Sequence, residues 1–273
     1  MLKLNQVSFA YTKGKPVIKD VTLTIADGEF LAIVGRNGSG KTTLTRLLMT
    51  LIKPTAGEIT IDGRTMKNLT PADMARHIGY VFQNPDRQLF RDTVAAEVAY
   101  GPEQLGFAPD KVAAAVEHAL AVTGLTGLAK AYPRLLTKGQ KQKVAIASAL
   151  AMQPRFLILD EPTSGQDAAE RENLLELLVE LNQQGMGVIL VTHDMDLLLR
   201  CAKRVIVMAD GRIVYDGSVI RLFTCPEVEK WGLRRPTVVK LSQGLAPYGI
   251  KPTTNLTDLY YNLARLLRGE ARA

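Results

Sequence analysis

The sequence predicts an α/β fold with a mainly parallel sheet, an antiparallel β subdomain near the N-terminus, a helical insertion and a small C-terminal helical appendage. Short apolar segments of strand length alternate with segments of helical periodicity along most of the chain. A glycine-rich loop joins one apolar segment to a helix, and two adjacent acidic residues end another. Strands that alternate with helices imply right-handed crossovers and therefore a mainly parallel sheet.

The N-terminal part of the chain is predicted to be rich in strands. Leu2–Tyr11 and Val17–Ile25 alternate apolar and polar side chains, as strands with one buried face do. Phe30–Val34 is apolar throughout, which indicates a strand buried on both faces. We expect a helix over Lys41–Ile52, ended by the proline that follows, and a further strand over Gly57–Ile61.

A helical insertion is expected from about Thr93 to Met152, because Val112–Val122 and Gln140–Met152 carry apolar residues at helical spacing. We expect residues 1–220 to form one domain, with the helical subdomain at about 86–153, and residues 221–273 to form the appendage. The later elements are expected as strands at Phe156–Leu159, Gly187–Val191 and Arg204–Met208 and as helices at Ala168–Gln183, Asp194–Cys201 and Leu256–Leu267.

Composition is that of a globular protein, with 47% hydrophobic and 22% charged residues. No apolar run approaches the roughly 18 residues that a membrane span requires, and the N-terminus lacks the apolar core of a signal peptide. We therefore expect a cytoplasmic protein, with Cys201 and Cys225 reduced. The net charge of +7 suits nucleic acid, an anionic membrane surface or phosphate ligands, and does not decide between them.

The glycine-rich loop matches the phosphate-binding pattern of P-loop NTPases. Its backbone is expected to wrap around phosphate oxygens, with Lys41 contacting the β- and γ-phosphates and Thr42 contacting Mg²⁺. The alternative is a glycine-rich turn that ends in Lys-Thr by chance, but a buried strand precedes the loop and a helix follows it. The candidate ATP-binding residues here are Gly35, Asn37, Gly38, Ser39, Gly40, Lys41, Thr42 and Thr43.

Asp160 and Glu161 end a hydrophobic strand, where two unpaired carboxylates are costly unless a positive charge lies nearby. We expect Asp160 to hold Mg²⁺ and Glu161 to orient and polarise the attacking water. The alternative is an ordinary solvated strand end. Gln83, after the expected strand Ile78–Phe82, fits a contact to both metal and water, and His193 fits a link between Glu161 and the γ-phosphate.

Together these segments resemble the ATP-binding-cassette (ABC) ATPases, in the same order and over about the first 220 residues. The resemblance implies a RecA-like core, hydrolysis of MgATP between two such subunits, stacking of Tyr11 on adenine, and a role for Asp167 in the Ser164–Asp167 segment. The P-loop alone would also admit kinases and GTPases. A kinase with Glu161 as its base leaves His193 and the helix from Gln140 unexplained.

Leu136–Gln140 lies where this family carries its LSGGQ signature, which binds the γ-phosphate of ATP held by the second subunit. Thr137, Gly139 and Gln140 are the implied contacts, at the start of a helix that favours anions. Lys138 replaces a glycine of the signature, and its side chain either crowds the phosphate or attracts it. We hypothesise that this chain pairs with a different cassette subunit, so that the two ATP sites are unequal.

A closer resemblance is to the ATPase subunits of energy-coupling-factor (ECF) importers, carried by residues 81–90 and 93–103 and by the length of the appendage. It implies that the appendage helps two ATPases to associate, and that a membrane subunit inserts an arginine beside Gln83. Asp86, Asp92 and Glu97 are candidates to receive this arginine. The alternative for each is an ordinary solvent-facing acid.

The leading hypothesis is therefore an ATP-hydrolysing subunit that energises uptake of a vitamin or transition-metal ion by ATP-driven closure of a dimer. Its expected partners are a second ABC ATPase, identical or different, and integral membrane subunits that dock near Gln83–Glu97, so the chain is expected at the cytoplasmic face of the membrane. Direct binding of nucleic acid is not expected. The alternative is a soluble ABC ATPase that acts on nucleic acid or ribosomes, which the basic pI favours.

Overall fold

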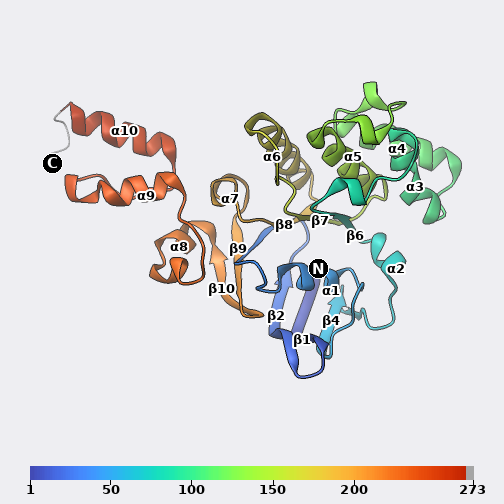
Figure 1. The fold of residues 1–273 in the computed structure, drawn as a ribbon, viewed down its shortest axis with the longest axis horizontal. Coiled ribbons are helices and arrows are strands. Elements are labelled where there is room, and N and C mark those ends of the chain that lie inside the picture. The colour runs from blue at the N-terminus through green and yellow to red at the C-terminus, as the bar shows by residue number, and fades with distance from the viewer. Residues whose placement is uncertain (269–273) are drawn as a thin grey trace.

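Two β-sheets of different type form the framework of the structure, a computed structural model that describes residues 1–268 (Figure 1). The smaller, antiparallel sheet has the strand order β2-β1-β4-β5, and the larger has the order β10-β9-β3-β8-β7-β6, parallel except for β10. The smaller sheet comprises β1 (Leu2–Thr12), β2 (Lys15–Ile25), β4 (Ala56–Ile61) and β5 (Arg64–Thr65), and the larger comprises β3 (Phe30–Val34), β6 (Ile78–Val81), β7 (Phe156–Asp160), β8 (Gly187–Val191), β9 (Arg204–Ala209) and β10 (Arg212–Ser218).

The central strands β3, β7 and β8 are buried along their whole length, which confirms the prediction that Phe30–Val34 is a strand covered on both faces. Their register aligns the carboxyl ends, since Ile33 pairs with Val191 and Val191 pairs with Asp160. The residues that follow these three strands therefore meet at one edge of the sheet, where ligands of open α/β folds bind.

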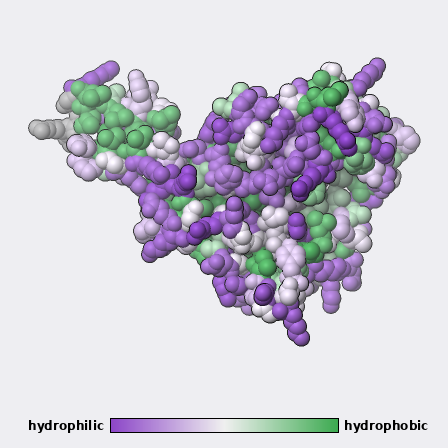
Figure 2. All heavy atoms as spheres, in the orientation of Figure 1, coloured by the Kyte–Doolittle hydropathy of each residue, from purple (hydrophilic) through white to green (hydrophobic). Residues whose placement is uncertain are grey.

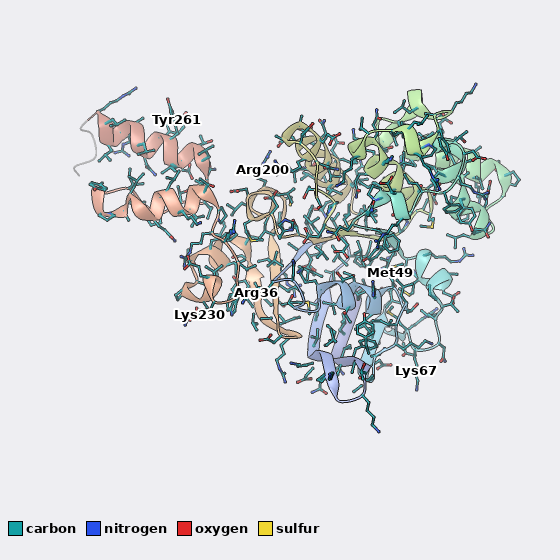
Figure 3. All side chains as sticks on the ribbon, viewed as in Figure 1. Arg36, Met49, Lys67, Arg200, Lys230 and Tyr261 are labelled. Atoms are coloured by element: carbon teal, nitrogen blue, oxygen red, sulfur yellow. The ribbon has the colours of Figure 1, made fainter. Side chains whose placement is uncertain are left out.

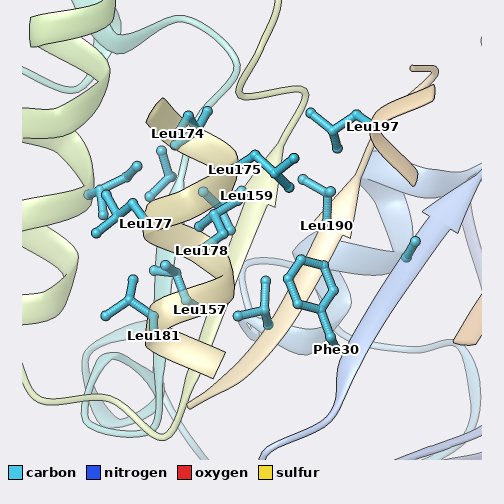
Figure 4. Close-up of a cluster of buried hydrophobic side chains, with 14 of the residues drawn as sticks. Phe30, Leu157, Leu159, Leu174, Leu175, Leu177, Leu178, Leu181, Leu190 and Leu197 are labelled. Atoms are coloured by element: carbon cyan, nitrogen blue, oxygen red, sulfur yellow. The ribbon is translucent and has the colours of Figure 1, made fainter. Parts of the chain in front are cut away.

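Helices cover the larger sheet, and Figure 4 shows α6 laid over β7 and β8 with its leucines turned toward the sheet. Helices α3, α4 and α5 pack against one another on the β6 side, while α9 and α10 lie side by side and project away from the rest (Figure 1). The helices are α1 (Lys41–Leu48), α2 (Pro71–Ala75), α3 (Val94–Gln104), α4 (Pro109–Val122), α5 (Lys138–Ala151), α6 (Ala168–Gln183), α7 (Met195–Cys201), α8 (Val219–Thr224), α9 (Thr237–Gly244) and α10 (Leu256–Leu267). Across residues 1–268, none of these helices combines the length and apolarity needed to cross a bilayer.

The first helix is shorter than predicted, because it ends at Leu48 rather than at Ile52. The amide of Leu51 donates to the carbonyl of Arg46, and the amide of Thr50 donates to the carbonyl of Leu47, which is the hydrogen-bond pattern of a Schellman cap. Thr50 takes the left-handed conformation of that cap with φ 54°, a position that usually carries glycine. The absence of glycine hid this helix end in the sequence.

Strand β10 and the start of α5 also differ from the prediction. Strand β10 was not predicted; it pairs with β9 through the turn at Asp210 and Gly211, which have φ values of 48° and 80°. Both positive angles suit the tight turn of a two-residue hairpin. Helix α5 begins at Lys138 rather than at Gln140, because Thr137 caps it and accepts a hydrogen bond from the Gln140 amide.

We predict that Gly187→Ala destabilises the protein by about 1–3 kcal/mol, the usual cost of overpacking a core. A Cβ atom at position 187 would lie 2.4 Å from Cδ1 of Phe156, its buried partner across the β7–β8 pair. Urea unfolding measures the effect. Gly244→Ala is the matched control, since a Cβ there meets nothing within 4 Å. An unchanged urea midpoint for Gly187→Ala would contradict the packing described.

Candidate active site

The loop after β3 is shaped to surround an anion. Gly35 and Gly40 have φ values of 148° and 107°, and a Cβ at Gly35 would lie 2.2 Å from the carbonyl oxygen of Met208 in β9. Only glycine fits there. Helix α1 begins directly after Gly40 and has no side-chain cap, so its first amide groups and its positive dipole end remain available to a phosphate.

Lys41 is buried in this loop, and its ammonium group donates to the carbonyl oxygens of Gly35 at 2.8 Å and Arg36 at 3.1 Å. Burial lowers the pKa of Lys41, and the nearby charges of Glu161 and Asp160 partly oppose that effect. A buried cation whose hydrogen-bond partners are neutral is strongly stabilised by the negative charge of a phosphate ligand.

The loop and the sheet edge together enclose a cavity of about 540 Å³, within the usual range of ligand pockets. Most of the predicted ATP-binding and catalytic residues meet in it, although they come from segments far apart in the chain. The lining residues are Val17, Asn37, Gly38, Gly40, Lys41, Thr42, Thr43, Gln83, Asp160, Glu161 and His193.

Asp160 and Thr42 offer the oxygen atoms that suit a magnesium ion. The hydroxyl of Thr42 donates to Oδ2 of Asp160 at 3.2 Å, and the hydroxyl of Tyr80 donates to the same oxygen at 3.3 Å. The described residues contain no cluster of three or more His, Cys, Asp or Glu side chains that could hold a metal alone. A cation here must complete its shell with phosphate oxygens and water, which is how Mg²⁺ binds beside nucleotides.

Glu161 is held against His193, whose Nδ1 lies 2.6 Å from Oε2 of the carboxylate. Glu161 is 9% exposed, and its φ of 51° is an uncommon conformation for a side chain of this size. Burial raises the pKa of Glu161, while His193 and Lys41 oppose the rise. Since an ionised carboxylate only accepts hydrogen bonds, the Nδ1 hydrogen of His193 donates to it.

Gly35, Ser39 and Tyr11 lie outside the cavity lining, although the sequence places them with the ATP-binding residues. Ser39 is buried beneath the loop, and its Oγ has no hydrogen-bond partner. Tyr11 is exposed beside the loop, with its hydroxyl 3.4 Å from Oγ1 of Thr43. The Tyr11 ring also packs edge-to-face on Phe9, and its hydroxyl accepts a hydrogen bond from Arg46 at 3.3 Å.

The residues of the signature segment lie apart from the P-loop cavity. Thr137, Gly139 and Gln140 line a separate small cavity at the start of α5. Asp167 caps α6, where its carboxylate accepts the amide of Glu170 at 2.8 Å. One chain therefore places its P-loop and its signature segment in different cavities.

Lys138 turns its side chain toward the loop before α6. A Cβ on Gly165 would lie 2.4 Å from the Lys138 Nζ, so the ammonium group covers the backbone of this glycine. Arg36 likewise points out of the P-loop and packs on Gly232, near Lys230 (Figure 3). Neither contact is indicated by the sequence, because each joins residues that are distant in the chain.

Glu97 is not suited to receive an arginine from a membrane partner, contrary to the interpretation from the sequence. It is 4% exposed, and its Oε2 accepts the amides of Phe90 and Arg91 at 2.8 and 2.7 Å. Asp86 already pairs with Lys141 at 2.8 Å. Asp92 is exposed and forms no ion pair with another of the described residues, so it is the best placed of the three acids.

The chain matches the ABC transporter family over residues 18–164. The energy-coupling factor transporter ATP-binding protein EcfA of Methanothermobacter thermautotrophicus is 35% identical, over 99% of this chain and 89% of that protein. The solved structure of CbiO1 from Clostridium perfringens, part of the ABC transporter complex CbiONQ, superposes with a TM-score of 0.78 and 35% identity, over 89% of this chain and 98% of that one. The dimeric structure of the ATP-binding cassette MJ0796, bound to ADP and Pi, superposes with a TM-score of 0.71 and 31% sequence identity. The match covers 80% of this chain and 99% of that one.

The fold and the cavity define an ATPase of the P-loop class. The chain belongs to the ABC transporter family, and it is an ATP-binding subunit whose ATP hydrolysis is coupled to transport. Its relatives include ATP-binding proteins of the ECF type, as the sequence predicted. Kinase and GTPase alternatives are thereby excluded.

We predict that Lys41→Ala weakens ATP binding by about 10- to 100-fold, because a hydrogen bond to a charged group contributes about 1.5–3 kcal/mol. Equilibrium titration with a fluorescent ATP analogue measures the change. Lys53→Ala is the matched control, since Lys53 is exposed and its ammonium group donates to the carbonyl of Lys67 instead. Equal affinity of Lys41→Ala and wild type would contradict the assignment of this cavity to ATP.

Proposed function

We propose that the chain is the ATP-hydrolysing subunit of an ECF-type importer, and that ATP drives closure of a dimer of such subunits. The observation that carries this proposal is the separation of the P-loop cavity from the signature segment within one chain. A complete ATP site then needs the signature segment of a second subunit. The similarity to EcfA and CbiO1 supports the importer class.

In this proposal the P-loop holds the triphosphate and the sheet edge holds the metal. Lys41 and the free amides at the start of α1 bind the phosphate oxygens, and Tyr11 stacks on the adenine. Thr42, Asp160 and Gln83 would hold Mg²⁺, and the bound ion would neutralise charge on the phosphates.

Glu161 and His193 supply the groups for attack on the γ-phosphate. Glu161 accepts a hydrogen bond from the attacking water and orients it in line with the bond that breaks, and Gln83, which lines the same cavity, contacts this water as well. His193 fixes the Glu161 carboxylate through the 2.6 Å contact and reaches toward the γ-phosphate with its other ring nitrogen. Positioning and charge neutralisation account for most of such catalysis.

The second subunit contributes the start of its α5. Thr137, Gly139 and Gln140 present a hydroxyl, an amide and a helix N-terminus to the γ-phosphate of the facing ATP. Asp167 holds the loop before α6 in place through its cap on that helix. Loss of the γ-phosphate on hydrolysis removes this link, so the two halves part.

The C-terminal appendage, residues 221–273, is proposed to assist association of the two ATPases. Figure 2 shows apolar side chains gathered over α9 and α10. Leu241, Leu256 and Tyr260 are 51%, 70% and 66% exposed, which is unusual for large apolar side chains in one small unit. Residues 1–220 then form the ATPase domain, with residues 86–153 as its helical part.

The surface around Gln83 is proposed as the docking site for the membrane subunit, which places the chain at the cytoplasmic face of a membrane. Phe82, directly before Gln83, and Phe90 are 44% and 55% exposed. Asp92 supplies a free carboxylate for a basic side chain of the partner. The cargo in this class is a vitamin or a transition-metal ion, which passes through the membrane subunits and not through this chain.

We predict that Glu161→Gln lowers ATP hydrolysis by about 100-fold or more, the usual contribution of a general base, and traps the closed dimer with ATP and Mg²⁺. Light scattering after size-exclusion chromatography measures the dimer, and phosphate release measures turnover. Glu176→Gln is the control, since Glu176 lies exposed on α6. Turnover of Glu161→Gln at the wild-type rate would refute its role.

Lys138→Gly is predicted to raise the ATPase rate of the purified chain about tenfold, which corresponds to about 1.4 kcal/mol. Glycine would allow the closer approach of the γ-phosphate that the Lys138 side chain hinders. Lys138→Arg, which keeps both bulk and charge, is expected to leave the rate low. A rate unaffected by Lys138→Gly would remove the basis for unequal ATP sites and for a different partner cassette.

A further inference from the structure

A ring of hydrogen bonds connects the metal-binding residues to the strand before Gln83. Oδ2 of Asp160 accepts from the hydroxyls of Thr42 and Tyr80, at 3.2 and 3.3 Å. The hydroxyl of Tyr80 lies 3.2 Å from Oγ1 of Thr45, which also donates to the carbonyl of Thr42 at 3.0 Å. The ring therefore joins β7, α1 and β6 through side chains that are far apart in the sequence.

Tyr80 and Thr45 are buried, with 9% and 0% of their surface exposed. Solvent therefore does not readily replace these hydrogen bonds, and a buried polar group that loses its partner is costly. Neither residue lines the P-loop cavity. Both residues therefore influence the site through Asp160 and do not contact a ligand directly.

The number of hydrogens available for donation fixes the direction of the hydrogen bonds around Tyr80. The carboxylate of Asp160 only accepts, so the single hydrogen of the Tyr80 hydroxyl is directed at Oδ2. The Thr45 hydroxyl also has a single hydrogen, which it shares between the carbonyl oxygen of Thr42 and the Tyr80 oxygen. With Thr42 donating to Oδ2 as well, one carboxylate oxygen holds two hydrogen bonds, and among the described residues Oδ1 receives none.

We propose that Tyr80 is a positioning residue for the divalent cation, because it fixes the rotation of the Asp160 carboxylate and leaves Oδ1 free to face the metal shell. Thr45 supports it by fixing the Tyr80 hydroxyl. This inference rests on the proposed role of Asp160 in holding Mg²⁺. Tyr80 also packs against Phe82 with ring centroids 4.7 Å apart, so it stands between the metal carboxylate and the exposed surface beside Gln83.

The test is Tyr80→Phe, which keeps the ring and removes only the hydroxyl. Mn²⁺ serves as the probe, and electron paramagnetic resonance measures free Mn²⁺ in titrations of the protein with ATP. We expect the dissociation constant of Mn²⁺ from the ATP-bound protein to rise about tenfold, whereas the affinity for ATP in EDTA stays within about twofold of wild type. A role in folding alone would not separate these two constants.

Tyr215→Phe is the matched control, since its hydroxyl donates to the carbonyl of Ser218 and is remote from the cavity lining. It should leave Mn²⁺ binding unchanged. If Tyr80→Phe fails to fold, Thr45→Val tests the same ring and should weaken Mn²⁺ binding in the same direction, while Thr45→Ser, which retains the hydroxyl, should restore it.

Asp160→Asn separates the two levels of the proposal. If Asp160→Asn abolishes tight Mn²⁺ binding and Tyr80→Phe leaves it unchanged, the positioning role of Tyr80 is overturned and the metal site stands. If Asp160→Asn also leaves Mn²⁺ binding unchanged, the assignment of Asp160 to the metal is itself wrong. Weakened Mn²⁺ binding in both variants, with ATP affinity in EDTA retained, supports Tyr80.

Discussion

The register of three buried parallel strands is the constraint on which the active site depends. β3, β7 and β8 end at the same level, so the P-loop, the Asp160–Glu161 pair and the loop of His193 all begin at one edge of the sheet. A shift of one residue in any pair would turn every side chain of that strand to the opposite face. The complete burial of β7, which α6 covers on one side (Figure 4), holds the register in place.

The electrostatics of the cavity follow from that arrangement. Lys41 is buried among carbonyl oxygens, Asp160 and Glu161 border the same cavity, and burial raises the pKa of the Glu161 carboxyl. Like and unlike charges are thereby held close together with little water between them. A triphosphate and a divalent cation bring the complementary charges, so the site is organised before its ligands arrive.

Most of this core was predictable because its signals are local. The apolar runs at Phe30–Val34 and Gly187–Val191 and the helices at Ala168–Gln183 and Leu256–Leu267 agree with the structure at both ends. The glycine spacing of the P-loop and the acids after β7 are likewise contiguous in sequence. Local patterns of this kind predict an element together with the segment that adjoins it in the chain.

The features that sequence analysis missed depend on pairs that are distant in the chain. Tyr80 lies in an expected strand, but nothing near it indicates that its hydroxyl reaches Asp160. Arg155 pairs with Asp27 and Asp62 across gaps of 128 and 93 residues. Glu97 resembles a solvent-facing acid until the fold buries it. Strand β10 was overlooked because its half-exposed alternation is weak and it lies at the edge of the sheet.

The packing of Arg36 on Gly232 gives the appendage a direct mechanical connection to the ATP-binding loop. Any side chain at position 232 would press on Arg36, because a Cβ there lies 2.4 Å from its Cδ. A rearrangement of the loop around a nucleotide therefore changes the surface on which residue 232 rests. Residue 232 thus ties the last part of the described chain to the ATP-binding loop through a contact that leaves no room for a larger side chain.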